Sequence, residues 1–145
     1  MEKERTLVLI KPDAVAKCLA GHVITDLYNL KLKMIAMKLV NVKKELAEKH
    51  YESLRDKPFF EKLIKHLTGE LHGKENVIAI VYEGENAVKK IRDAAGKTHP
   101  EEADFTSIRG KYGRVDSRTD CFENVIHASD SRENAEKEIK LWFKK

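Results

Sequence analysis

Residues 6–13, with the sequence TLVLIKPD, predict a strand that runs directly into a helix. The apolar run has no polar interruption, which is typical of a buried strand, and Pro12 suits the first turn of a helix, where its missing N–H needs no partner. Apolar residues then recur at helical spacing, at Val15, Leu19, Val23, Leu27 and Leu30. Gly21 interrupts this pattern and predicts a division into two shorter helices.

The remaining hydrophobic pattern completes an alternating series of elements. Strands are predicted over residues 34–42, 77–82 and 124–127, and helices over residues 45–54, 59–67, 86–95 and 131–143. Pro58 separates the two consecutive helices, and Gly96 ends the helix before it. The order β-α-β-αα-β-α-β-α matches the ferredoxin-like, split βαβ pattern of the α+β class. We therefore expect a four-stranded antiparallel sheet with helices packed on one of its faces.

The run from Asn124 to Ser131 carries more chemical information than any other stretch. Its single imidazole, His127, stands where a short apolar strand ends and a helix begins. Asp130 is predicted to cap that helix, with Glu133 as its partner in a capping box. The unpaired N–H groups of a helix start favour a nearby phosphate. This position both fixes and exposes His127 as a candidate nucleophile, although an ordinary capping or core histidine is the alternative.

Length and composition predict one soluble domain, residues 1–145. The chain is 41% hydrophobic and 36% charged, which is typical of a compact fold and not of a disordered chain. Its net charge of +4 fits a nucleic-acid surface or an anionic small ligand. Because 28 basic and 24 acidic residues are interleaved along the chain, we expect small anionic ligands, and nucleic acid is an unlikely partner.

The termini and the cysteines favour a cytoplasmic location. The N-terminus is charged, and the apolar run Leu7–Ile10 is far too short for a signal peptide or a membrane span. Cys18 and Cys121 are widely separated, so they predict neither a disulfide framework nor a metal site. We expect reduced thiols and no membrane association.

The stretch 97–123 is long and poor in apolar residues. A loop of this size in a compact domain usually has a function. It contains Thr98, Arg109 and Arg114, whose side chains suit anion binding.

Four motifs together resemble the nucleoside diphosphate kinase family. They are residues 6–13, Lys57-Pro58-Phe59-Phe60, Ser107-Ile108-Arg109-Gly110 and residues 124–131, and the resemblance runs from Arg5 to Phe143. Their order makes the resemblance specific, and no Walker A or protein-kinase signature competes with it.

The resemblance implies ping-pong transfer of a phosphoryl group through a phosphohistidine. His127 would take the γ-phosphoryl group from a nucleoside triphosphate and pass it to a nucleoside diphosphate. This role suits the side chain, because a neutral imidazole, with an ordinary pKa of about 6.5, is a competent nucleophile at cytosolic pH. For the same reason we expect activity to fall towards acidic pH.

The resemblance also assigns the residues around the nucleophile. Glu138 would bind the non-reacting imidazole nitrogen, with support from Ser129. The phosphates and the ribose would be bound by Lys11, Tyr51, Arg92, Thr98, Arg109 and Asn124, with Lys11 also in the catalytic set. Phe59 would stack on the base, with Val115 a candidate for its other face, so both purine and pyrimidine nucleotides should be accepted. Taken singly, each of these side chains would read as surface charge or core.

No carboxylate cluster has the spacing of a dedicated Mg²⁺ cage. We therefore expect no metal ligand from the protein and Mg²⁺ bound mainly through the nucleotide phosphates. The remaining histidines are scattered singly and are expected to pack, cap or face solvent; they are His22, His50, His66, His72 and His99.

The chain departs from the family pattern at several points. Ala128 replaces the usual Gly after the histidine, and residues 105–107 lack a Pro-Gly pair found in a loop that contributes to subunit packing. Residues 69–76 and 111–123 form longer segments than usual, and the second is either a flap that adds Arg114 or Arg118 to the phosphate site or a solvated turn. The resemblance implies a homo-oligomer, with a hexamer as the family default and a tetramer or dimer left open.

Two other functions remain open at this point. One is a nucleic-acid-binding or regulatory module with a vestigial kinase site, and the other is a ferredoxin-like ligand sensor without catalysis.

Overall fold

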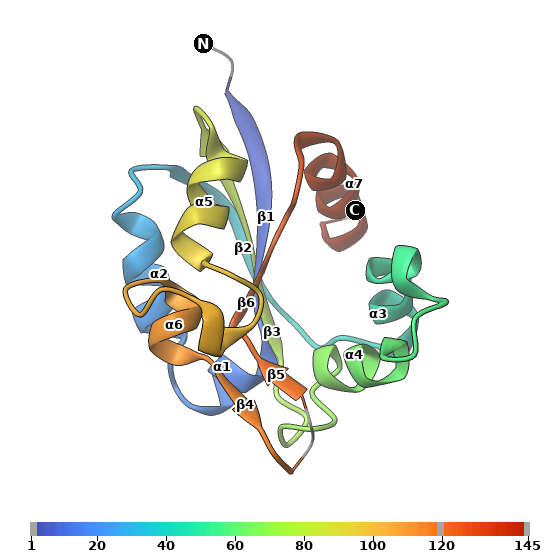
Figure 1. Ribbon diagram of the computed structural model, residues 1–145. Helices are drawn as coiled ribbons and strands as arrows, with labels where there is room; N and C mark the ends of the chain where they lie inside the picture. Colours follow the sequence, from blue (N-terminus) through green and yellow to red (C-terminus); the bar gives the residue numbers. More distant parts are fainter. Residues whose placement is uncertain (1–2, 119–120, 144–145) are drawn as a thin grey trace.

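The computed structural model describes residues 3–118 and 121–143 (Figure 1). The strands are β1 (Glu4–Ile10), β2 (Lys33–Val40), β3 (Val77–Gly84), β4 (Arg114–Asp116), β5 (Cys121–Glu123) and β6 (Ile126–Ala128). The helices are α1 (Pro12–Ala16), α2 (Ala20–Tyr28), α3 (Lys44–His50), α4 (Phe60–Leu67), α5 (Ala87–Ala95), α6 (Ile108–Tyr112) and α7 (Arg132–Trp142), with 3-10 turns at Glu52–Leu54 and Pro100–Glu102. The predicted order of the main elements is confirmed.

The predicted four-stranded antiparallel sheet is also confirmed, with the order β2-β3-β1-β6. The central strand β1 pairs with β3 along its whole length and with β6 at its end, where Leu9 lies opposite His127. The apolar run that opens the chain therefore forms the rigid base on which His127 is mounted.

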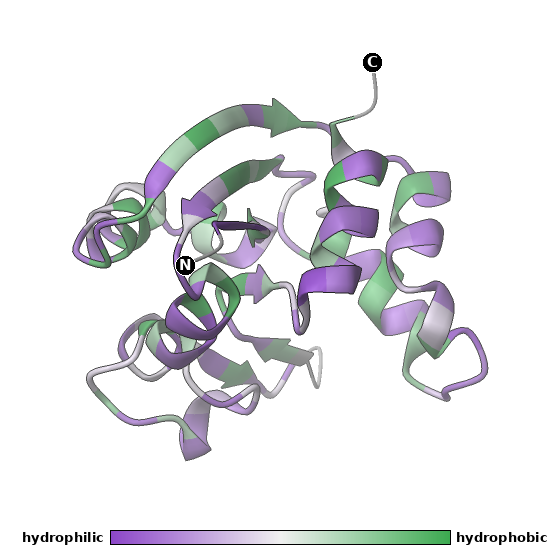
Figure 2. Cartoon of the chain, turned by 90° about the horizontal axis from the view of Figure 1, so that it is seen from above, coloured by the Kyte–Doolittle hydropathy of each residue, from purple (hydrophilic) through white to green (hydrophobic). Residues whose placement is uncertain are grey.

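Helices cover both faces of the sheet, so the prediction of one covered face is wrong. Val8 and Ile10 pack in a cluster with the inner sides of α2 and α5, whereas Leu7 and Leu9 pack in a second cluster with α4 and α7. Figure 1 shows these helix groups on opposite sides of β1. In Figure 2 the helices alternate hydrophilic and hydrophobic residues, as expected for helices buried on one side. Burial on both faces explains why β1 has no polar alternation.

Three local predictions differ from the structure. The break between the first two helices falls at Cys18, whose φ is 61°, and Gly21 lies inside α2. The cap of α7 is Ser131, whose Oγ accepts a hydrogen bond from Asn134 N at 3.1 Å, and not Asp130 in a capping box. The stretch 97–123 is not one loop, because it folds into α6 and the β4–β5 hairpin.

A buried carboxylate joins residues 69–76 to the β4–β5 hairpin. Glu123 ends the β4–β5 hairpin with its side chain fully buried, and His72 from the other segment lies 3.2 Å from its Oε2. Arg114 donates to Glu123 Oε1 from Nε at 2.9 Å, and Lys17 forms a further ion pair with it. Breaking such a buried group of charges is costly, so the hairpin is fixed against the body of the protein.

Among the described helices, none combines the length and the hydropathy that a membrane span requires.

Two histidines with lowered pKa values lead us to predict that the protein loses stability in weak acid. Burial lowers the pKa of His66 and holds the pKa of His50 well below its ordinary value of 6.5. The unfolded chain therefore binds more protons than the folded protein once the pH falls below about 6.5, and the free energy of unfolding declines there. Urea unfolding midpoints should decrease from pH 7 to pH 5, and less steeply in His66→Gln. Equal midpoints over this range would contradict the prediction.

Candidate active site

One cleft, with a volume of about 780 Å³, gathers nearly all of the predicted site residues. It lies between the segment that joins α3 to α4 on one side and β6 on the other. Its lining includes every predicted site residue except Ser129, namely Lys11, Tyr51, Phe59, Arg92, Thr98, Arg109, Asn124, His127 and Glu138. These residues come from distant parts of the chain, so the fold alone brings them together.

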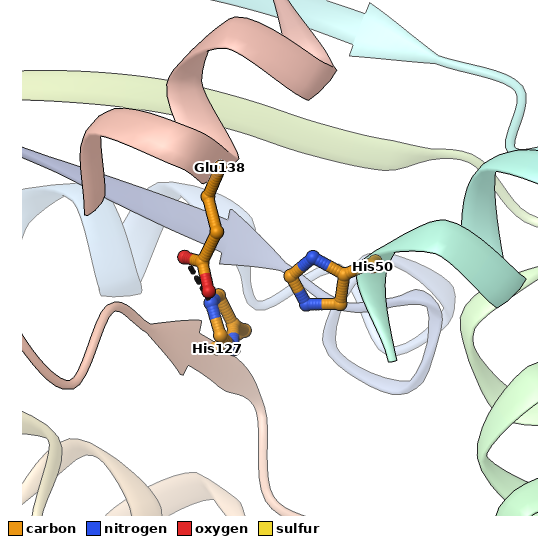
Figure 3. Close-up of side chains that lie close together, drawn as sticks. All are labelled: His50, His127 and Glu138. Carbon is orange, nitrogen blue, oxygen red and sulfur yellow. Dashed lines mark hydrogen bonds and ion pairs between the residues drawn. The ribbon is translucent and has the colours of Figure 1, made fainter. Parts of the chain in front are cut away.

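His127 is held through one ring nitrogen. Its Nε2 lies 2.8 Å from Glu138 Oε1, which comes from the facing helix α7 (Figure 3). Because a carboxylate only accepts, Nε2 carries the proton and donates it. Ser129 Oγ donates to the same Glu138 oxygen at 2.7 Å and accepts from Leu7 N at 3.2 Å. This series of hydrogen bonds anchors the imidazole to β1. Glu138 engages Nε2, so Nδ1 is the other ring nitrogen.

The backbone before His127 adopts an unusual conformation. Val125 has a φ of 74°, in the left-handed region that a β-branched residue rarely enters. Its N–H donates to Asp13 Oδ2 at 3.1 Å, and its carbonyl accepts from Lys11 N at 2.9 Å. Asp13 is held in turn by His66 Nε2 at 3.0 Å. The start of α1 therefore sets the direction in which β6 begins.

Arg109 uses its guanidinium to hold the backbone around the site. It donates to the carbonyls of Gly96, Asn124 and Ile126 at 2.9, 3.2 and 2.8 Å. Burial, together with the charge of Arg92, lowers the pKa of Arg109 to about 10. The two positive charges repel each other, so an anion bound between Arg92 and Arg109 would stabilise both guanidiniums.

Lys11, Asn124 and Arg92 are also held in place by hydrogen bonds. Lys11 Nζ donates to Asn124 Oδ1 at 2.9 Å, and Asn124 Nδ2 donates to the carbonyl of Thr98 at 3.2 Å. Arg92 Nη1 donates to the carbonyl of Ala128 at 3.2 Å. The site is thus a preorganised group of donors around His127, which suits a ligand that carries several negative charges.

Phe59 lies at the edge of the cleft with 45% of its surface exposed, where a flat apolar ligand can stack on it. The β4–β5 hairpin does not extend the site. Val115 is not part of the cleft lining, while Arg114 pairs with Glu123, and Arg118 pairs with Asp116. The hypothesis of a flap that adds an arginine is therefore not supported by the geometry.

His50 is the residue of the cleft that the sequence did not single out. Its ring centroid lies 4.4 Å from that of His127, with the two planes at 80°. Its position next to Tyr51, itself a predicted site residue, was the one signal in the sequence. Among the described residues, the only close group of three His, Cys, Asp or Glu side chains is His50, His127 and Glu138. Two imidazoles suit Mg²⁺ poorly, since this ion prefers oxygen ligands.

The sequence matches proteins of known identity over nearly its whole length. A model of the nucleoside diphosphate kinase family matches residues 4–145. The nucleoside diphosphate kinase of Pyrococcus horikoshii is 49% identical over 143 residues, covering 99% of this chain and 87% of that protein.

Two solved structures match as well. A halophilic nucleoside diphosphate kinase from Halobacterium salinarum in complex with CDP has a TM-score of 0.87 at 37% identity, covering 99% of this chain and 90% of its own. A transition state mimic of the Borrelia burgdorferi enzyme with vanadate and ADP has a TM-score of 0.88 at 32% identity, covering 98% and 88%. The family predicted from the four motifs is thereby confirmed, and the chain belongs to the nucleoside diphosphate kinase family of enzymes.

Proposed function

We propose that the protein transfers the γ-phosphoryl group from a nucleoside triphosphate to a nucleoside diphosphate in two steps, through phosphorylated His127. The observation that carries this proposal is the single-sided anchoring of the imidazole. Glu138 holds Nε2, and the ring lines a cleft that also contains Lys11 and Arg92. The tautomer that results leaves the lone pair on Nδ1, where a nucleophile needs it.

The first step exchanges one bond to phosphorus for another. The Nδ1 lone pair attacks the γ-phosphorus, the bond from that phosphorus to the β,γ-bridging oxygen breaks, and the nucleoside diphosphate leaves with the electron pair. Glu138 stabilises the positive charge that develops on the ring. A different nucleoside diphosphate then enters the same cleft and reverses the step. The fixed cations neutralise the charge of the transferred group, which is the main requirement of this chemistry.

Mg²⁺ is proposed to enter on the nucleotide phosphates, where it supplies additional charge neutralisation when bound. The carboxylates that line the cleft already have partners within the protein, since Glu138 accepts from His127 and Ser129, Glu52 pairs with Arg55, and Asp130 accepts from Asn134 Nδ2 at 2.7 Å. This donor set fits a metal ion that is held by the substrate and not by the protein.

The proposal is tested by following a labelled phosphoryl group from ATP to the protein and then to GDP. Incubation with γ-labelled ATP should produce protein-bound label that is stable in alkali and lost in acid, as expected for a phosphorylated imidazole. Addition of unlabelled GDP should move this label into GTP. Exchange that proceeds only while both nucleotides are bound together, without labelled protein, would overturn the proposal.

Broad base specificity is predicted from the stacking surface at Phe59. Stacking on an aromatic ring is worth roughly 1 to 3 kcal/mol for any base. Phe59→Ala should therefore raise the Kd of ADP and CDP by about tenfold or more, and to a similar extent, in a titration of the protein with each nucleotide. A loss confined to one of the two nucleotides would indicate recognition of the base edge instead.

We also propose that the chain forms one cytoplasmic domain that assembles with copies of itself. The edge strand β2 exposes the large apolar side chains of Ile35, Met37 and Leu39, and Leu39 has 64% of its surface exposed. A second β2, antiparallel to the first across a two-fold axis, would satisfy the unpaired edge and cover these side chains in one contact. Light scattering should give at least a dimer, and Leu39→Glu should lower the mass. A monomer at micromolar concentration would contradict this.

A further inference from the structure

His50 reaches the nucleophile from the end of α3. A nitrogen of His50 lies within 4.8 Å of a nitrogen of His127. Figure 3 shows the two rings side by side, with Glu138 approaching His127 from a different element. His50 also lines the cleft in which the phosphoryl group would move. It is therefore the nearest imidazole that the mechanism above does not use.

Trp142 fixes the tautomer of His50. The indole Nε1 of Trp142 donates to His50 Nδ1 at 3.1 Å. An indole N–H has no acceptor capacity, so Nδ1 presents its lone pair, and the proton of neutral His50 must reside on Nε2. Burial, with the charges of His127 and Lys11, also holds the pKa of His50 well below its ordinary value. Tyr51 packs edge-on against the ring, at a centroid distance of 4.8 Å.

This proton distinguishes a hydrogen-bond donor from a metal ligand. A metal ion held by the three side chains would need a lone pair from each of them. Both hydrogen bonds that Glu138 accepts, from His127 and from Ser129, end on Oε1, so its carboxylate keeps further lone pairs. His50, however, can free the Nε2 lone pair only by moving its proton to Nδ1, against the N–H of Trp142. His50 thus presents a proton on Nε2 where a metal ion would require a lone pair, and a protonated Nε2 suits an anionic oxygen.

We propose that His50 donates a hydrogen bond from Nε2–H to an oxygen of the phosphoryl group as it moves to and from His127. This inference rests on the proposed function. The proton stays on His50 throughout, while the Nδ1–P bond of His127 forms and the bond to the leaving oxygen breaks. His50 would thereby stabilise the charge on the transferred group, and Trp142 would act as its positioning residue.

Two substitutions at position 50 separate the donor from the fold. His50→Asn places an amide oxygen near the former Nδ1, so the bond from Trp142 can persist, but its N–H₂ group falls short of the cleft. His50→Gln carries an N–H₂ group near the former Nε2. We expect the rate of His127 labelling at saturating ATP to fall about 10²-fold in His50→Asn. His50→Gln should restore most of that loss, and Trp142→Phe should give an intermediate rate.

The affinity for ADP distinguishes a hydrogen-bond donor from a residue that only maintains the structure of the cleft, because only loss of the structural role would weaken ADP binding. ADP lacks the phosphoryl group that His50 contacts, so the Kd of ADP should be the same in the wild type, His50→Asn and His50→Gln. Labelling of His50→Asn at the wild-type rate would overturn the proposal, as would equal losses in His50→Asn and His50→Gln or weaker ADP binding in parallel with the rate. Absence of label from the wild type would instead refute the phosphohistidine mechanism itself.

Discussion

Replacement of His127 by Ala should lower turnover with ATP and GDP by roughly 10⁵-fold and abolish labelling of the protein. No other described group combines a basic nitrogen, a place in the cleft and an anchor of the kind that Glu138 provides. The other imidazole of the cleft, His50, has its Nδ1 lone pair engaged by the N–H of Trp142 and its proton on Nε2, so it has no free lone pair with which to attack phosphorus. The measurements are a coupled turnover assay and the alkali-stable label after incubation with γ-labelled ATP.

A matched control is available in His22. This histidine is exposed on α2, where its ring stacks loosely on Tyr112 at a centroid distance of 6.2 Å, and it is absent from the cleft lining. His22→Ala should leave turnover, labelling and the unfolding midpoint near the wild-type values. Alkali-stable label that persists in His127→Ala would show that another residue is the nucleophile.

The main elements were predictable because their local signals agree with the final packing. The run in β1 is apolar without interruption, and Pro12 starts a helix where the sequence places it. The number of covered sheet faces was mispredicted, although the same run indicates burial on two sides. The helical spacing of apolar residues predicts which side of a helix is buried. It does not predict which face of the sheet the helix packs on, because that face depends on the connections between distant strands.

Small boundary errors have a similar origin. Asp130 and Ser131 are both good capping residues and stand next to each other, so the backbone decides between them. Ser131 has the extended φ and ψ of a cap, with values of −154° and 163°. The break at Cys18 requires a positive φ in a residue that seldom adopts one, and no local rule predicts it.

Site residues in contiguous motifs could be predicted from the sequence, whereas those that depend on distant contacts could not. Lys11, Arg109 and Asn124 could be predicted because they belong to contiguous signatures, and the fold brings all three into the cleft. His50 was classed with scattered histidines because its partner Trp142 lies 92 positions further along the chain. Its tautomer, and hence its chemistry, depends on that contact. Sequence alone gives the residue type but not the atom that points at the ligand.

Asp13 offers the second large effect, because it holds the strained backbone that precedes His127. A β-branched residue at positive φ costs on the order of 1–3 kcal/mol and persists only where its surroundings fix it. Asp13 supplies that constraint at Val125, and it is itself fully enclosed. Burial alone would raise its pKa, but the hydrogen bond from His66 and the charge of Lys11 hold the pKa below its ordinary value. Asp13 therefore accepts as a carboxylate at neutral pH.

Asp13→Ala should lower the free energy of unfolding by about 3–5 kcal/mol, since it removes the buried carboxylate that accepts from both His66 Nε2 and Val125 N. It should also release Val125 towards an extended conformation and shift His127, two residues later, so that labelling slows at least tenfold, because a small displacement of a reacting group is costly. Asp13→Asn retains an oxygen for the Val125 N–H and should lose only about 1 kcal/mol. Urea unfolding measures the first effect, and the labelling rate per folded molecule measures the second. If Asp13→Ala matches Asp13→Asn in both, Val125 is held by the sheet and not by this carboxylate.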